Sequence, residues 1–113
     1  MAVTAGYRDF VIEQLERFAL ITAKNMFGGV GLYAEAYFFA LIDEDRLYFK
    51  VDDSNRSDFE AAGMEPFRPY GDERAMQYYE VPIEVLEDVD LLQQWAEKAV
   101  AVAREARRRK RRS

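Results

Sequence analysis

The chain has 113 residues, of which 50% are hydrophobic and 14% aromatic, a length and composition typical of one globular domain with its own core. It contains no Cys and no His, which excludes disulfides, cysteine-containing zinc sites and catalysis by a thiol or an imidazole. The net charge of −5 is divided unevenly, because residues 1–103 hold 9 Lys and Arg against 20 Asp and Glu, whereas residues 104–113 hold 7 Lys and Arg against one Glu.

The N-terminus lacks the charged start and apolar run of a signal peptide, and no segment approaches the ~18 apolar residues of a membrane span. We therefore expect a cytoplasmic protein without membrane contact. An acidic body repels a phosphate backbone, so we expect any contact with nucleic acid to be made by the basic end, residues 104–113.

The first predicted element is a helix over residues 4–19. One face of it carries, at helical spacing, Tyr7, Phe10, Val11, Gln14, Leu15 and Phe18. Three strands with two short hairpin connections follow, the strands over residues 25–33, 37–42 and 46–51 and the connections over 34–36 and 43–45. The first strand contains Gly28, Gly29 and Gly31, which indicates a bulge or a close backbone approach rather than a regular ladder. A phosphate-binding loop is not indicated, because the segment lacks the lysine and the Ser or Thr of such a loop.

A short helix is predicted to start at Asp53 or Ser54, to run through Ala62 and to stop at Gly63. The oxygen-rich stretch 52–58 has no Gly at the sixth position of a calcium loop and no helix before it. We interpret this stretch as a strand end followed by a helix cap. We accordingly expect no metal and no cofactor.

Two further strands are predicted near residues 65–70 and 75–81, and Pro82 opens a short helical turn. A long helix then begins around Asp88 or Asp90. Its apolar stripe consists of Leu91, Trp95, Ala99 and Val102. The expected fold is therefore a two-layer α+β domain with an antiparallel sheet and the order α-β-β-β-α-β-β-α. Residues 1–113 form a single domain that ends in a basic helix end, residues 104–113.

A sheet with helices on one side leaves a second face, for which the alternating pattern makes Tyr33, Phe38, Tyr48 and Tyr78 candidates. An exposed aromatic patch marks a partner or ligand surface, and on that ground we expect a homodimer. The alternative is that the long C-terminal helix covers this face.

Two groups of cations are candidate binding residues. Lys24, Lys50 and Arg56 are expected to converge as an anion-binding patch near the glycine segment. The basic end supplies Arg104, Arg107, Arg108, Arg109, Lys110, Arg111 and Arg112. This second group is interpreted either as a solvated helix end, where cations interact favourably with the helix dipole, or as a contact for nucleic acid or an acidic partner.

Several segments in order resemble one protein family. They are residues 26–33 (Met-Phe-Gly-Gly-Val-Gly-Leu-Tyr), 39–42 (Phe-Ala-Leu-Ile), 47–53 (Leu-Tyr-Phe-Lys-Val-Asp-Asp) and 76–82 (Met-Gln-Tyr-Tyr-Glu-Val-Pro), with Asn55-Arg56, Phe59-Glu60, Gly63 and Pro66-Phe67 between them. The series resembles the N-terminal domain of the TfoX/Sxy family, bacterial competence regulators that act with the cyclic-AMP receptor protein at promoters.

The resemblance implies an α+β module with an antiparallel sheet, a protein partner in the transcription machinery, and no catalytic residues. At one hairpin, where the family has an acidic residue and then Gly, this chain has Glu35-Ala36, which disfavours a tight primed turn. The family's second, helical domain is absent from these 113 residues, so we expect a stand-alone N-terminal module.

We therefore expect a non-enzymatic regulatory or interaction module that works through protein contacts. The competing function is a small-ligand-binding domain that uses the aromatic face of the sheet. A third class, an enzyme that uses carboxylates or Tyr hydroxyls, has no particular residue pair in its favour.

Overall fold

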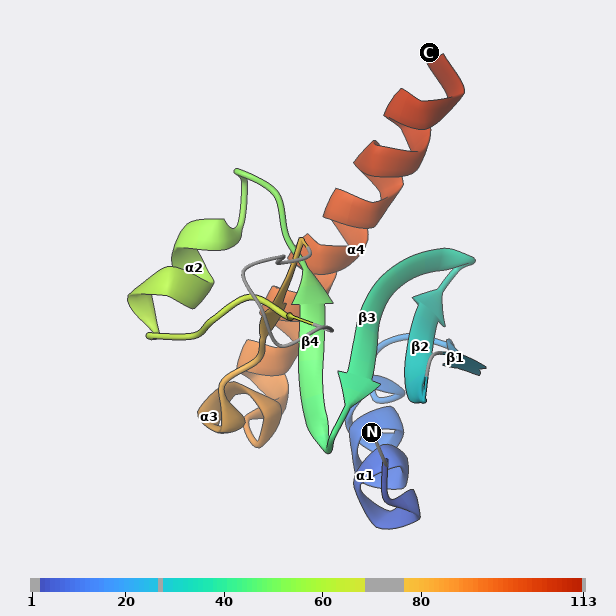
Figure 1. Ribbon diagram of the computed structural model, residues 1–113, viewed down its shortest axis with the longest axis vertical. Coiled ribbons are helices and arrows are strands. Elements are labelled where there is room, and N and C mark those ends of the chain that lie inside the picture. The colour runs from blue at the N-terminus through green and yellow to red at the C-terminus, as the bar shows by residue number, and fades with distance from the viewer. Residues whose placement is uncertain (1–2, 27, 69–76, 113) are drawn as a thin grey trace.

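The computed structural model describes residues 3–26, 28–68 and 77–112 (Figure 1). The helices and strands in those ranges are α1 (Ala5–Leu15), β1 (Ile21–Met26), β2 (Gly29–Ala34), β3 (Tyr37–Asp43), β4 (Arg46–Lys50), α2 (Arg56–Ala61), β5 (Tyr78–Glu80), α3 (Ile83–Leu86) and α4 (Val89–Arg112). The strands form one antiparallel sheet in the order β1-β2-β3-β4-β5. The predicted α+β fold with an antiparallel sheet is confirmed.

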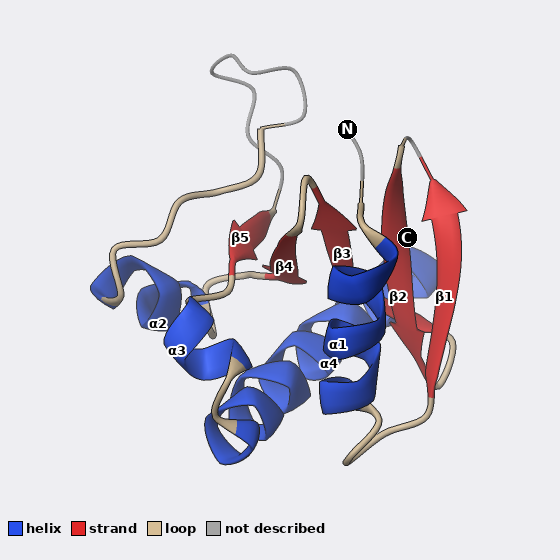
Figure 2. Cartoon of the chain, turned by 90° about the horizontal axis from the view of Figure 1, so that it is seen from below, coloured by secondary structure: helices blue, strands red, loops and turns tan. Residues whose placement is uncertain are grey.

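All four helices lie on one side of the sheet (Figure 2). The core fills the space between them and this sheet face, and its largest fully buried side chains include Phe39, Phe49, Phe59, Leu15, Leu32 and Leu92. Helix α4 crosses β3 and β4 and buries a stripe of small residues, Ala96, Ala99 and Ala103. Small side chains let a helix approach a sheet closely, so α4 packs on this face. The alternative in which α4 covers the aromatic face is therefore wrong.

The single strand predicted over residues 25–33 is wrong, because the segment forms two strands, β1 and β2, joined by a hairpin, whereas the close backbone approach predicted at its glycines is confirmed. The strands meet at the pair Met26–Gly29, and Gly28 between them has a φ of 81°, which a residue without Cβ adopts readily. A Cβ at Gly29 would collide with the carbonyl oxygen of Ile42, and one at Gly31 with the Met26 side chain. The glycines therefore allow a hairpin and close packing. A register shift does occur further on, between Leu32 and Tyr33.

The other two hairpins have two-residue turns, Glu35-Ala36 and Glu44-Asp45, and all four residues have φ between 51° and 71°. Positive φ at both central residues is the feature of a type I′ turn, whose twist matches that of the flanking strands. The expectation that Glu35-Ala36 disfavours a tight primed turn is therefore wrong, because strand pairing imposes the turn on residues that do not favour it.

The observed helix termini agree in part with those predicted from the sequence. Thr4 caps α1 through its hydroxyl, which accepts the N–H of Tyr7, but the helix ends at Leu15 rather than at residue 19. Helix α4 begins at Val89, close to the predicted start, and the Asp88 carboxylate caps it by accepting the N–H of Asp90. On α4 the buried leucine is Leu92, whereas Leu91 is exposed.

In the middle of the chain the N-cap of α2 is Asn55, not Asp53 or Ser54, and Gly63, with φ of 76°, follows the helix as predicted. The predicted strand near residues 65–70 is reduced to a single bridge between Pro66 and Tyr79. Residues 69–70 of that strand and 75–76 of the next lie outside the described residues.

Candidate functional site

The second sheet face carries the aromatic residues that the alternating pattern placed there. We define the aromatic face as Tyr33, Phe38, Leu41, Tyr48, Phe67 and Tyr78. The rings of Tyr33 and Phe38 stack with centroids 5.1 Å apart, and Phe38 lies 5.7 Å from Tyr78. Tyr48 packs on Phe67 with centroids 4.8 Å apart. The rings thus form a second, small core on the sheet face opposite the helices.

This face is less open than expected. Tyr48 and Tyr78 are only 8% and 4% exposed, whereas Tyr33 and Phe38 are half-buried. Burial, and then the neighbouring Tyr33, raises the pKa of the Tyr78 hydroxyl to about 12. The expectation that Tyr48 and Tyr78 are exposed is therefore wrong, because their rings are packed against neighbours.

Two lysines bound the row of rings. Lys24 Nζ lies 5.1 Å from the Tyr33 ring centroid, and Lys50 Nζ lies 5.0 Å from that of Tyr78. Both distances fit cation–π contacts. Burial lowers the pKa of the Lys50 ammonium.

The predicted convergence of Lys24, Lys50 and Arg56 near the glycine segment is wrong. Lys24 pairs with Gly31 on the edge strand β1, whereas Lys50 ends β4, three strands away, and Arg56 begins α2. The misplacement follows from the missed hairpin, which moves Lys24 to the edge of the sheet. Only Lys50 and Arg56 share a site, together with Arg109 of α4.

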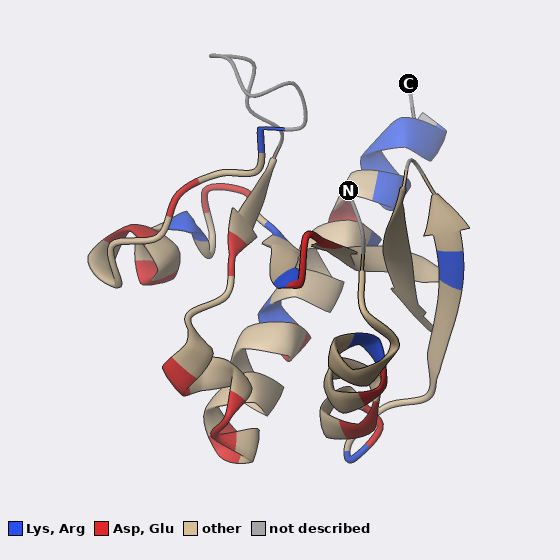
Figure 3. Ribbon diagram, turned by 60° about the horizontal axis from the view of Figure 1, so that its bottom comes forward, with Lys and Arg blue, Asp and Glu red and all other residues tan. Residues whose placement is uncertain are grey.

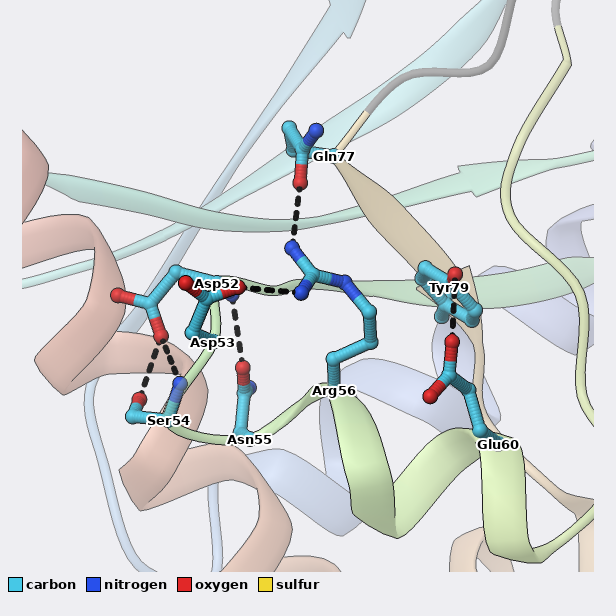
Figure 4. A network of polar contacts seen from close by, with 8 residues as sticks. All are labelled: Asp52, Asp53, Ser54, Asn55, Arg56, Glu60, Gln77 and Tyr79. Atoms are coloured by element: carbon cyan, nitrogen blue, oxygen red, sulfur yellow. Dashed lines mark hydrogen bonds and ion pairs between the residues drawn. The ribbon is translucent and has the colours of Figure 1, made fainter.

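That site is a pocket of about 560 Å³ at the end of β4. Figure 4 shows its polar network: the Arg56 guanidinium donates to the Asp53 carboxylate and, at 3.3 Å, to Gln77 Oε1. The Ser54 hydroxyl donates to Asp52 Oδ1 at 2.5 Å, and the Ser54 N–H donates to the same oxygen at 2.7 Å. The hydroxyl first, and then the N–H, lowers the pKa of the Asp52 carboxyl. The carboxylates here are engaged in holding the turn before α2.

Asn55 fixes the same turn from inside. Its buried side chain accepts the Asp52 N–H at 2.9 Å and donates to the Lys50 carbonyl at 3.1 Å. Asp58, further along, is paired with Lys98 of α4 at 2.8 Å. The interpretation of stretch 52–58 as strand end and helix cap agrees with these contacts.

The basic helix end, residues 104–112, continues α4 beyond the sheet (Figures 1 and 3). The guanidinium groups of Arg104 and Arg107 lie 5.2 and 5.5 Å from the Tyr37 ring centroid. Glu105 accepts hydrogen bonds from Arg108 at 2.8 Å and Arg109 at 3.4 Å, and its pKa is lowered first by Arg108. The cations therefore extend from a formed helix rather than from a frayed end.

One surface was missed by the sequence patterns. A groove of about 450 Å³ lies between the α1–β1 connection, the sheet and α4, and we call it the β1-edge groove. Its apolar walls include Phe18, Ile21, Ala34, Phe39, Ala96 and Val100. Leu20, on its rim, is 89% exposed. The only sequence signal was the apolar run Phe18-Ala19-Leu20-Ile21 after the first helix.

In the part of the chain that the structure describes, no helix is long and apolar enough to cross a membrane. No curated protein matches the sequence. Residues 13–103, from the last turn of α1 to the last buried alanine of α4, match the TfoX N-terminal domain, and the match ends immediately before the basic helix end. Because the match covers most of the 113 residues, the chain belongs to the TfoX N-terminal domain family.

Proposed function

We propose that this chain is a non-enzymatic regulatory module of the cytoplasm that binds a protein partner and pairs with a second copy of itself at the β1-edge groove. The observation that carries the proposal is Leu20, 89% exposed beside a groove with apolar walls. Burying a leucine side chain contributes about 1.5–3 kcal/mol. A surface that exposes one beside an apolar groove is suited to association.

The position of the groove supports a protein as its occupant. It adjoins β1, the edge strand, whose outer side offers backbone N–H and C=O groups to another strand. In a twofold-symmetric dimer the same surface patch faces itself, so that patch must contain both groups of every contact. Here Leu20 and the groove that would receive it share one patch, and its rim carries Glu97 together with Arg104, so charges of opposite sign can pair across the axis.

The regulatory role follows the family. The chain resembles the N-terminal domain of competence regulators, and we infer that its partner belongs to the transcription machinery. The absence of His and Cys from the sequence supports a non-enzymatic role.

The proposal is tested by comparing Leu20→Glu with Ile83→Glu, a matched control. Ile83 is also a large exposed apolar residue, at 54%, but lies on α3 and does not line the groove. Sedimentation equilibrium should give a dimer for the natural chain and for Ile83→Glu, and a monomer for Leu20→Glu with an unchanged circular dichroism spectrum. A monomeric natural chain, or a dimeric Leu20→Glu variant, would refute the dimer.

The partner requires a second measurement. The natural chain and both variants serve as baits in cytosol from the native host. Recovery of a transcription protein by the natural chain and Ile83→Glu, but not by Leu20→Glu, is the expected result. Equal recovery by all three baits would contradict the use of the groove.

Small-ligand binding at the aromatic face is the second candidate. It is favoured by a pocket of about 520 Å³ that Tyr48 and Phe67 line together with the ion pair Arg46–Glu80, whose nearest atoms are 3.7 Å apart. A thermal-shift screen of small metabolites, repeated with Phe67→Ala, distinguishes the two candidates. A hit lost in this variant would favour the ligand function.

A further inference from the structure

The basic helix end has an unusual density of charge. Residues 104–112 hold seven cations and one acidic residue, and from Arg104 to Arg112 the helix rises about 12 Å at ~1.5 Å per residue. The positive charges are thus spaced at about 2 Å along the helix axis. Duplex DNA carries one negative charge per ~1.7 Å of its axis. The two densities are nearly equal.

The cations are also arranged on a formed surface. At ~100° per residue, Arg104, Arg107, Arg108 and Arg111 fall within about 100° of the helix circumference. The guanidinium groups of Arg104 and Arg107 lie over the ring of Tyr37. Arg108 is oriented by Glu105, with donor–acceptor distances of 2.8 to 3.0 Å. Side chains already held in place lose less conformational entropy when they bind an anion.

The segment differs in charge from the rest of the chain. Residues 1–103 carry 20 Asp and Glu against 9 Lys and Arg and would repel a polyanion, but the basic helix end extends past the sheet (Figures 1 and 3). It also lies outside the family match, which stops at residue 103. The domain shared by the family therefore does not account for these cations.

We propose that the basic helix end binds the phosphate backbone of nucleic acid without reading the bases. Six of the seven cations are arginines, whose planar guanidinium groups match phosphate oxygens bidentately. A duplex presents one negative charge per ~1.7 Å along its whole length, so it can meet every cation of the basic helix end. This inference does not rest on the β1-edge groove, so either proposal can fail alone.

The test measures the affinity of the full chain for a labelled 24-base-pair duplex of random sequence at 50 to 300 mM NaCl. Each phosphate contact adds about 0.9 to the slope of log affinity against log salt. The variant Arg107→Gln/Arg108→Gln/Arg111→Gln should therefore lower that slope by about 3. Gln favours helix about as well as Arg, and Arg104 is left in place because it also lines the groove.

Two further variants separate this site from general charge. Lys98→Gln makes a charge change of the same sign on the same helix, next to Asp58 and outside the basic end, and should change affinity less than twofold. Glu105→Gln removes a negative charge from the basic end, and this gain outweighs the lost orientation of Arg108, so the variant should bind several-fold more tightly. Loss of binding in Glu105→Gln, or an unchanged salt slope in the triple variant, would overturn the proposal.

Competition experiments against the labelled duplex distinguish DNA from RNA, and nucleic acid from an acidic polypeptide. Duplex RNA of the same sequence competing as well as DNA supports backbone recognition, and the ratio of the two affinities identifies the preferred nucleic acid. Poly-glutamate of equal total charge should compete at least tenfold more weakly. Equal competition by poly-glutamate would instead assign the surface to acidic proteins and overturn the assignment to nucleic acid.

Discussion

The Glu35-Ala36 turn offers a direct test of the backbone geometry. Ala36 has a φ of 71° and is exposed to solvent, so its Cβ strains the turn without packing against the core. Glycine has no such penalty at positive φ. We predict that Ala36→Gly stabilises the protein.

The magnitude is a difference of two opposed effects. The left-handed conformation costs a residue with a Cβ about 1–2 kcal/mol, and Gly removes this cost. Gly also makes the unfolded chain more flexible, which costs about 0.4–1 kcal/mol on folding. The free energy of unfolding should therefore rise by about 0.5–1 kcal/mol, equivalent to about 2–5 °C in Tm for a domain of this size.

Ala101→Gly is the matched control, since the substitution is the same and Ala101 is also exposed but lies inside α4. Gly in a helix interior costs about 1 kcal/mol, so the control should be destabilised. Urea unfolding followed by circular dichroism gives both values. If Ala36→Gly were destabilised as Ala101→Gly is, the turn would not have positive φ at Ala36 and the strand register of β2 and β3 would be in doubt.

Two further predictions concern a helix cap and a buried hydroxyl. Asp88→Ala removes the carboxylate that accepts the N–H groups of Asp90 and Leu91, and should lower the free energy of unfolding by about 1 kcal/mol, against no more than ~0.5 kcal/mol for Gln94→Ala on the exposed side of α4. The pKa of Tyr78 is raised to about 12 from an unfolded value of 10.0, so the folded state keeps a proton that the unfolded state loses. The free energy of unfolding should therefore not change through this group below pH 10 and should fall between pH 10 and 12. In Tyr78→Phe this fall should be less steep, as measured by urea unfolding at a series of pH values. An equally steep fall in Tyr78→Phe would contradict the raised pKa.

The sequence predicted best those elements in which many apolar residues recur with the period of a helix or of a strand. The face of α1 around Val11 and Leu15 and the central strand β3 were both visible in this way. Glycines were harder to interpret, since a strand bulge and a two-residue hairpin both use them. Treating the segment around Gly28 as one strand rather than a hairpin removed one strand from the predicted order.

That error explains much of what was missed at the candidate sites. Register decides which residues are neighbours across a sheet, so losing one strand moved Lys24 from the sheet edge to an imagined cluster with Lys50. Leu20 was missed for another reason: nothing in its sequence context distinguishes a buried leucine from one that is 89% exposed. The exposure of Leu20 depends on where α1 ends and on the path of the chain into β1, and both are set by tertiary structure.

Helix α4 connects the two proposed binding surfaces at one residue. Up to Ala103 its inner stripe is buried against the sheet, and beyond it the helix has no core to pack on, so its composition can follow binding rather than folding. Arg104 stands at this boundary, where it lines the β1-edge groove and lies over Tyr37 beside Arg107. A partner in the groove that pairs with Arg104 withdraws one cation from phosphate. Coupling between two binding events is reciprocal, so nucleic acid must weaken the groove contact by the same factor. The coupling is limited to the contribution of one charge. Binding at either surface should therefore weaken binding at the other only slightly.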